Sequence, residues 1–246
     1  MNFDNATVLG VPGDALNDPE RRAAVSSFVK RVVRTGCSVI LVVGAASPSE
    51  ASLMSPTADV LDRAAATVEA ATRQAIAARD DLRWIGVHAV LADPRETGPV
   101  ARGHVLSAEP RTIRVRRLAE LAEDADVVVM PGDAGVNSSG DVVSLGEDGE
   151  ELTAVFIGDK LAIPVRLLRT HAAGGSESTA WSLPRRAALL ARSTGVNVAY
   201  EPVPLPGALP TRQDEPGARS SRERATAVLD AVVGAERRAR PQLLAS

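Results

Sequence analysis

The sequence predicts an α/β fold, a three-layer α/β/α sandwich with a mainly parallel central sheet. Short apolar runs rich in β-branched residues alternate with longer segments of helical periodicity. These runs are apolar at nearly every position, as in strands that are covered on both faces. The 246 residues, 45% of them hydrophobic, suffice for such a core. We expect one domain over residues 1–246.

The first half of the chain begins with a strand at Ala6–Gly10 and a glycine-bearing turn. A helix starts at Asp18, which can cap it, with proline at the next position, where its fixed φ is favourable. Gly36 ends this helix. The apolar face of this helix consists of Val25, Phe28, Val29, Val32 and Val33. There follow a buried central strand at Ser38–Val43, a loop at Gly44–Pro56 and an alanine-rich helix at Thr57–Arg79.

The second half continues the alternation. The sequence predicts a strand at Trp84–Val90, a segment broken by proline and glycine through Gly103, a helix at Arg114–Asp124 and a strand at Asp126–Met130. A hairpin turn at Asn137–Gly140 leads into Val142–Leu145. The remaining elements are a helix at Leu152–Leu161, a strand at Ile163–Leu168, a loop at His171–Ser178, a helix at Leu183–Arg192 and a strand at Val196–Tyr200. Residues 201–221 are rich in proline and glycine and predict an irregular segment. A last helix, Ser221–Arg238, carries an apolar stripe that we expect to pack on the core.

Composition excludes several classes of function. Aromatic residues make up 2% of the chain and the net charge is −3, which argues against nucleic-acid partners because those need stacking platforms and a basic groove. Cys37 is the single cysteine, and His88, His104 and His171 lack the spacing of metal ligands. The longest apolar run is far shorter than the roughly 20 residues that span a bilayer. We expect a cytoplasmic protein without membrane contact, and the arginine-rich, lysine-poor composition indicates a GC-rich bacterial genome.

In a parallel α/β sheet, ligands bind at the carboxyl ends of the strands. Four loops reach that edge: Gly10–Asp14, Gly44–Glu50, Pro131–Gly135 and Gly146–Glu151. Their glycines allow the backbone to approach a ligand closely, and helix starts after them offer free N–H groups. The candidate substrate-binding residues are Gly10, Gly44, Ala45, Ser47, Gly132, Asp133, Glu147, Asp148 and Glu151. We assign no catalytic residue and no metal ligand.

The order of these loops resembles the amino-acid kinase family, and within it the aspartate kinases. Val8-Leu9-Gly10-Val11 stands where that family has Lys-Phe-Gly-Gly, and Asp18-Pro19-Glu20-Arg21 matches its helix start. Val42–Ser47 is similar to Val-Val-Ser-Ala-Met-Gly, and Val129–Gly135 to Val-Val-Ala-Gly-Phe-Gln-Gly. Ser139–Ala154 matches the following glycine-rich segment. The resemblance implies an amino-acid kinase fold without a regulatory domain.

The chemistry departs from that family at three places. Val8 replaces the lysine of the first strand, and Glu147-Asp148-Gly149-Glu150-Glu151 stands where the family has Arg-Gly-Gly-Ser-Asp. Leu168–Gly175 lacks the acidic nucleotide-binding motif. Phosphoryl transfer needs positive charge around the phosphate oxygens. A carboxylate about 4 Å from one costs on the order of 1 kcal/mol in water and several in a drier site. The only lysines, Lys30 and Lys160, fall on helices, where surface positions are expected.

These departures leave more than one hypothesis. The first is an aspartokinase-like protein with a degraded ATP site, non-catalytic as a kinase, that binds a small metabolite or assembles with itself or another protein. The alternative is an accessory enzyme of specialised metabolism that uses the rewired pocket. It would catalyse ATP-dependent phosphotransfer to a small carboxylate or amino-acid-like substrate, or another reaction, with Asp133, Glu147, Asp148 and Glu151 holding Mg²⁺ or the substrate. The acidic run is either such a cation site or a solvated helix start. A third possibility is an oligomeric scaffold, a homodimer that pairs through the Thr57–Arg79 helix, whose alanine-rich composition permits close helix packing without requiring it.

Other residues admit simpler interpretations. Asp133 either orients a substrate amine or hydroxyl or only forms the turn. Arg166 and Arg169 either bind an anion or make surface ion pairs. Ser47 has no partners that would form a nucleophilic triad, and Cys37 is expected to be an inert core residue.

Overall fold

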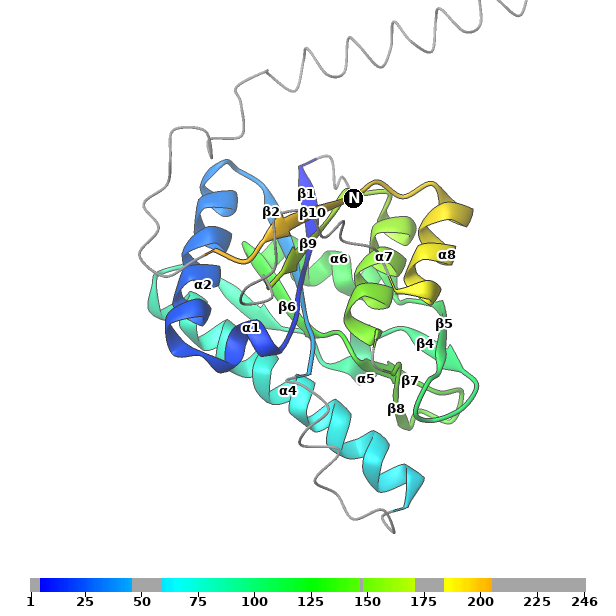
Figure 1. The fold of residues 1–246 in the computed structure, drawn as a ribbon. Helices are drawn as coiled ribbons and strands as arrows, with labels where there is room; N and C mark the ends of the chain where they lie inside the picture. The colour runs from blue at the N-terminus through cyan, green and yellow to red at the C-terminus, as the bar shows by residue number, and fades with distance from the viewer. Residues whose placement is uncertain (1–4, 46–58, 147, 171–183, 205–246) are drawn as a thin grey trace, which may run out of the picture. The chain divides into compact units, whose positions relative to one another are not determined.

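The computed structural model describes residues 5–45, 59–146, 148–170 and 184–204, all within one compact unit that spans Met1–Pro206. Its centre is a six-stranded parallel sheet with the strand order β10-β9-β1-β2-β6-β3 (Figure 1). The strands are β1 (Ala6–Val11), β2 (Ser38–Val43), β3 (Ala89–Leu91), β6 (Val127–Pro131), β9 (Val165–Arg169) and β10 (Val198–Pro202). The predicted α/β class and the mainly parallel sheet are therefore confirmed.

Helices cover both faces of this sheet (Figure 1). They are α1 (Asp14–Asn17), α2 (Pro19–Arg34), α4 (Val60–Trp84), α5 (Pro94–Thr97), α6 (Val115–Asp124), α7 (Gly149–Leu161) and α8 (Arg185–Thr194). Side chains of α1, α2 and α4 pack on one face, and those of α6, α7 and α8 pack on the other. The three predicted layers are present.

The alternation of side chains along each strand decides which layer a residue joins. In β2, Leu41 and Val43 pack toward α2 and α4, whereas Ile40 and Val42 pack toward α6 and α7. All four are at most 1% exposed, which explains why the sequence is apolar from Val39 to Val43. In the described residues no helix is long and apolar enough to cross a membrane.

A second, four-stranded sheet has the order β5-β4-β7-β8 and was not predicted. It contains β4 (Val100–Arg102), β5 (Glu109–Thr112), β7 (Ala134–Val136) and β8 (Val142–Ser144). The antiparallel pair β7–β8 is the predicted hairpin, closed by the turn at Asn137–Gly140. The pair β4–β5 lies in and just after the segment that was predicted to be broken by proline and glycine. It was missed because strands of three or four residues are too short for their periodicity to be recognised.

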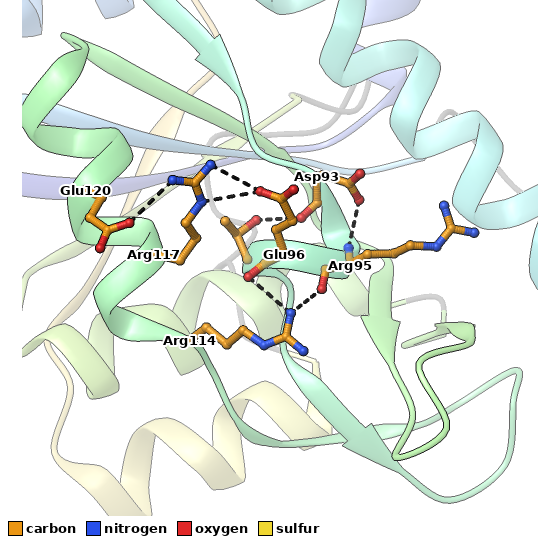
Figure 2. Close-up of polar contacts among 7 residues, drawn as sticks. Asp93, Arg95, Glu96, Arg114, Arg117 and Glu120 are labelled. Carbon is orange, nitrogen blue, oxygen red and sulfur yellow. Dashed lines mark hydrogen bonds and ion pairs between the residues drawn. The ribbon is translucent and has the colours of Figure 1, made fainter.

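Ion pairs join α5 and α6 beside this small sheet (Figure 2). Arg117 contacts Glu96 at 3.2 Å and Glu120 at 3.3 Å, and Arg114 donates to the carbonyl oxygens of Arg95 and Glu96. These charged side chains are largely exposed, so their ion pairs add little to the stability that the apolar core provides.

Three predicted boundaries are wrong. The strand predicted at Trp84–Val90 is instead the end of α4, where Trp84 is 91% exposed, and β3 begins at Ala89. The helix runs past Arg79 until Gly86, whose φ of +80° breaks it. Helix α7 begins at Gly149 and not at Leu152, so part of the acidic run is helical. The irregular segment after Val203 and the predicted C-terminal helix lie outside the described residues.

Candidate functional site

The candidate site lies where the carboxyl ends of β1, β2 and β6 meet the start of α7. Gly10 belongs to the end of β1, Gly44 follows β2, and Gly132 follows β6. A Cβ built on Gly44 would lie 2.6 Å from Glu150 Oε2, and one on Gly132 would lie 2.7 Å from Glu150 Cα. A Cβ on Gly10 would lie 3.2 Å from Glu150 Oε1. The glycines therefore let α7 come close to the sheet edge. The sequence predicted a ligand beside them, whereas a side chain of the protein itself approaches them here.

Glu150 fills the space between these glycines. The residue is 5% exposed, and its Oε1 atom is buried without a hydrogen-bond partner among the described residues. Burial raises its pKa well above the usual value. The neighbouring acids Glu151, Asp133 and Asp14 add to this increase, and Arg169 opposes it. A carboxyl group in this place resists ionisation.

Asp133 lies beside Glu150 in the turn after β6. It is 5% exposed, and its carboxylate accepts hydrogen bonds from the backbone N–H groups of Ala45 and Glu150. Burial raises its pKa to about 7, the two hydrogen bonds lower it, and the charges of Glu151 and Asp148 raise it. Asp133 therefore ties the loop after β2 to the first turn of α7.

The start of α7 is fixed to the sheet by a buried hydrogen bond from Thr153 Oγ1 to the carbonyl oxygen of Gly132, 2.6 Å long. Two arginines pair with the remaining acids. Arg169 in β9 contacts Glu151, and Arg186 in α8 contacts Asp148. Both guanidinium groups are thus engaged by carboxylates of the protein, so neither stands free to meet a phosphate group.

Both lysines of the chain lie away from this edge. Lys30 donates to the carbonyl oxygen of Ile85, where α2 passes the end of α4, and Lys160 pairs with Asp159 at 2.7 Å near the end of α7. Arg166 pairs with Glu201 at 2.5 Å, which agrees with the ion-pair alternative of the two that the sequence left open for this arginine. Cys37 is half-buried, and burial raises the pKa of its thiol.

The structure brings together most of the predicted site residues. Gly10, Gly44, Ala45, Gly132, Asp133, Asp148 and Glu151 lie around the start of α7. Ser47 and Glu147 lie outside the described residues, as does the stretch from His171. The prediction missed Glu150, although it stands at the serine position of the motif that the family resemblance had aligned. It also missed the pairing roles of Arg169 and Arg186.

The interpretation of the acidic run as a solvated helix start is wrong for its last two residues. Glu150 and Glu151 are 5% and 6% exposed, because the helix begins three residues earlier than predicted and turns both toward the sheet. Among the described residues, no three His, Cys, Asp or Glu side chains are arranged to hold a metal ion. The arrangement pairs its two arginines with carboxylates and presents further carboxyl oxygens to a hydrogen-bond donor or a cation.

No protein-family model matches the chain. An aspartokinase of Helicobacter pylori is 27% identical over 157 residues, which cover 61% of this chain and 38% of that enzyme. The chain thus spans well under half the length of this curated relative.

Solved structures of aspartate kinases share the fold. The enzyme from Synechocystis gives a TM-score of 0.64 at 19% identity, with 80% of this chain and 38% of that one covered. E. coli aspartokinase III, solved with aspartate and ADP, gives 0.65 at 13% identity, with 80% and 62% covered. The resemblance to aspartate kinases, drawn from the motifs, is confirmed in sequence and in fold.

Proposed function

We propose that this aspartokinase-like chain does not phosphorylate a carboxylate from ATP, and that it uses the carboxyl edge of its sheet to bind a small metabolite. The observation that carries the proposal is the position of Glu150. Its side chain occupies the space between Gly10, Gly44 and Gly132, at the edge where ligands of parallel α/β sheets bind.

The charges at this edge of the sheet support the proposal by an argument that does not depend on the space that Glu150 fills. A phosphoryl group in transfer carries negative charge on three oxygens and needs cations or N–H donors around it. At this edge the backbone N–H groups of Ala45 and Glu150 already bind Asp133, and Arg169 and Arg186 already bind carboxylates. Val8 is fully buried in β1 and supplies no charge. A phosphate placed here would meet acids without free counter-charges.

The direct test is an assay of ADP release with aspartate, ATP and Mg²⁺. We expect no turnover above the enzyme-free rate, against the roughly 1–100 s⁻¹ at which kinases typically operate. A catalytic rate in that range would contradict the proposal.

One observation favours the alternative, an accessory enzyme that uses ATP and Mg²⁺ in the rewired pocket. Asp133 has a pKa of about 7 in a buried cluster, and such a group can accept and donate protons near neutral pH. Under this alternative, Asp133, Glu147, Asp148 and Glu151 would hold the cation or the substrate. Alanine at Glu151 would then abolish turnover of the true substrate, whereas unchanged turnover would exclude the assignment.

A further inference from the structure

We propose that Glu150 is a removable plug, which leaves the space between the glycines at the ends of β1, β2 and β6 when its carboxyl group loses a proton. The inference rests on the proposed function, because it concerns the regulation of the same edge of the sheet. In the structure this edge is closed: Glu150 is 5% exposed, and a Cβ built on any of the three glycines, Gly10, Gly44 and Gly132, would lie within 3.2 Å of it. A metabolite can therefore enter only after Glu150 has moved.

The closed position suits only the protonated form of the Glu150 carboxyl group. Its Oε1 atom is buried and makes no hydrogen bond with any described residue. Burial, and after it the charges of Glu151 and Asp133, raise the pKa of Glu150 well above its ordinary value of 4.5. A buried carboxylate without a hydrogen-bond donor is far more costly than a buried neutral carboxyl group. Loss of the proton therefore favours a position in which water reaches Glu150.

The charged groups around the start of α7 do not relieve this cost. Among the described residues they come from each element that borders the plug: Asp14 in α1, Asp133 after β6, Asp148 and Glu151 in α7, Arg169 in β9 and Arg186 in α8. Arg169 is already paired with Glu151, and Arg186 with Asp148. An ionised Glu150 would thus add to a surplus of negative charge, and the repulsion favours its withdrawal into solvent.

The first turn of α7 can move while the rest of the helix stays in place. The side chain of Asp148, the N-cap residue, makes no capping hydrogen bond. The N–H of Glu150 is bound to Asp133, and one turn later Thr153 Oγ1 donates to the carbonyl oxygen of Gly132 at 2.6 Å. Helix ends open more easily than helix centres. The moving part is therefore the turn that carries Glu150, and the fixed part begins at Thr153.

Withdrawal of the plug is coupled to the loss of a proton. In the closed state Glu150 keeps its proton above pH 4.5, whereas in water it titrates at its ordinary pKa. Above pH 4.5 the withdrawn state therefore binds fewer protons than the closed state. Its population should rise by up to about tenfold per pH unit until the pKa of the closed state is reached. The edge is closed in acid and opens as the pH increases.

The test is amide hydrogen exchange of the full chain, followed by NMR from about pH 5 to about pH 8 and divided by the rate of an unstructured peptide at each pH. The reporters are the N–H groups of Gly44 and Gly132, which donate to the carbonyl oxygens of Val11 and Val43 beside the plug. We expect their protection to fall by up to about tenfold per pH unit over the lower part of this range.

Two variants assign this pH dependence to Glu150. Glu150→Gln keeps the shape of the side chain and cannot ionise, so the protection of both reporters should no longer fall with pH. Glu69→Gln, on the exposed face of α4, should behave as the unaltered chain does. Constant protection in the unaltered chain, or the same decrease in Glu150→Gln, would overturn the inference.

The amide of Leu41 in β2 distinguishes opening of this edge from unfolding of the whole chain, and its protection should exceed that of Gly44 at every pH. Equal protection at the two amides would also overturn the inference, and this comparison decides if circular dichroism shows that Glu150→Gln is unfolded. The assay of ADP release separates the two proposals. Constant protection without ADP release overturns the plug alone, whereas ADP release overturns the proposed function.

Discussion

At the scale of single residues, the carboxyl edge depends on side chains with raised pKa values. Asp133 is protonated in the folded state up to about pH 7, whereas an unfolded chain releases that proton near its ordinary pKa of 3.8. Between these values the folded state binds more protons than the unfolded state, so the free energy of unfolding falls as pH rises. The protein should be most stable on the acidic side of this range, before other groups protonate.

Asp133→Asn tests this statement. The variant cannot ionise at this position, so its stability relative to the unaltered chain should increase by roughly 3–4 kcal/mol between about pH 4 and pH 8. Urea unfolding at a series of pH values measures the difference. Asp62→Asn, at an exposed position of α4, should leave the pH profile unchanged. Parallel profiles for Asp133→Asn and the unaltered chain would show that Asp133 ionises normally in the folded protein.

A double-mutant cycle tests whether Glu150 occupies the space between Gly10, Gly44 and Gly132. Gly44→Ala should destabilise the protein by about 1–3 kcal/mol because the new Cβ meets Glu150 Oε2, and most of this loss should disappear in a Glu150→Ala background.

Gly132→Ala provides the matched control for this cycle. Its Cβ meets the Cα of Glu150, which the alanine substitution does not remove, so its cost should persist in the Glu150→Ala background. Equal costs of Gly44→Ala in both backgrounds would mean that Glu150 points elsewhere.

Sequence could predict part of this site and not the rest. The glycines at the strand ends and Asp133 follow from the topology rule for parallel sheets, so the sequence could place Gly10, Gly44 and Gly132 at this edge. Glu150 was overlooked because acids at a helix start are usually solvated and stabilised by the helix dipole. Its burial depends on where α7 begins, and a shift of three residues at a helix boundary changes which side chains face the sheet.

At the scale of elements, α8 contacts the start of α7 through the polar side chain of Arg186 as well as through its apolar residues. Arg186 Nε donates to Asp148 Oδ1 at 2.9 Å, and the same guanidinium donates to the carbonyl oxygens of Leu145, Ser107 and Ala108. This arginine therefore links helices α7 and α8 with the ends of the small sheet.

Arg186→Met should lower the free energy of unfolding by about 1–3 kcal/mol, since it leaves a mostly buried Asp148 carboxylate and three carbonyl oxygens without this donor. Arg185→Ala, one residue earlier and exposed, should cost less than about 0.5 kcal/mol. Thermal unfolding of the two variants makes the comparison. Equal losses would indicate that α8 is held by its apolar contacts alone.

Elements with strong periodicity were predicted well and short ones were not. The strand Ser38–Val43 was exact because five consecutive apolar residues, Val39–Val43, leave no other placement. By contrast, the strand predicted at Trp84–Val90 begins on a residue that belongs to α4, because that helix continues to Trp84. The strands of the small sheet have three or four residues, which is too short for periodicity to decide.

At the scale of the whole molecule, α4 offers a surface for self-association. Leu61 and Ile76 are 61% and 37% exposed on this long helix. We propose a homodimer through α4. Light scattering should then give twice the chain mass of 25.6 kDa, and Leu61→Glu with Ile76→Glu should return the mass to that of one chain. A single-chain mass for the unaltered protein at micromolar concentration would exclude this dimer.

The central claim is that the acidic residues around Glu150 leave this aspartokinase-like fold unable to bind nucleotides. The most direct measurement is a calorimetric titration of the full chain with ATP in the presence of Mg²⁺. The position of Glu150, with Arg169 and Arg186 engaged by Glu151 and Asp148, predicts no binding heat up to millimolar ATP. Saturable binding at micromolar ATP would contradict the claim.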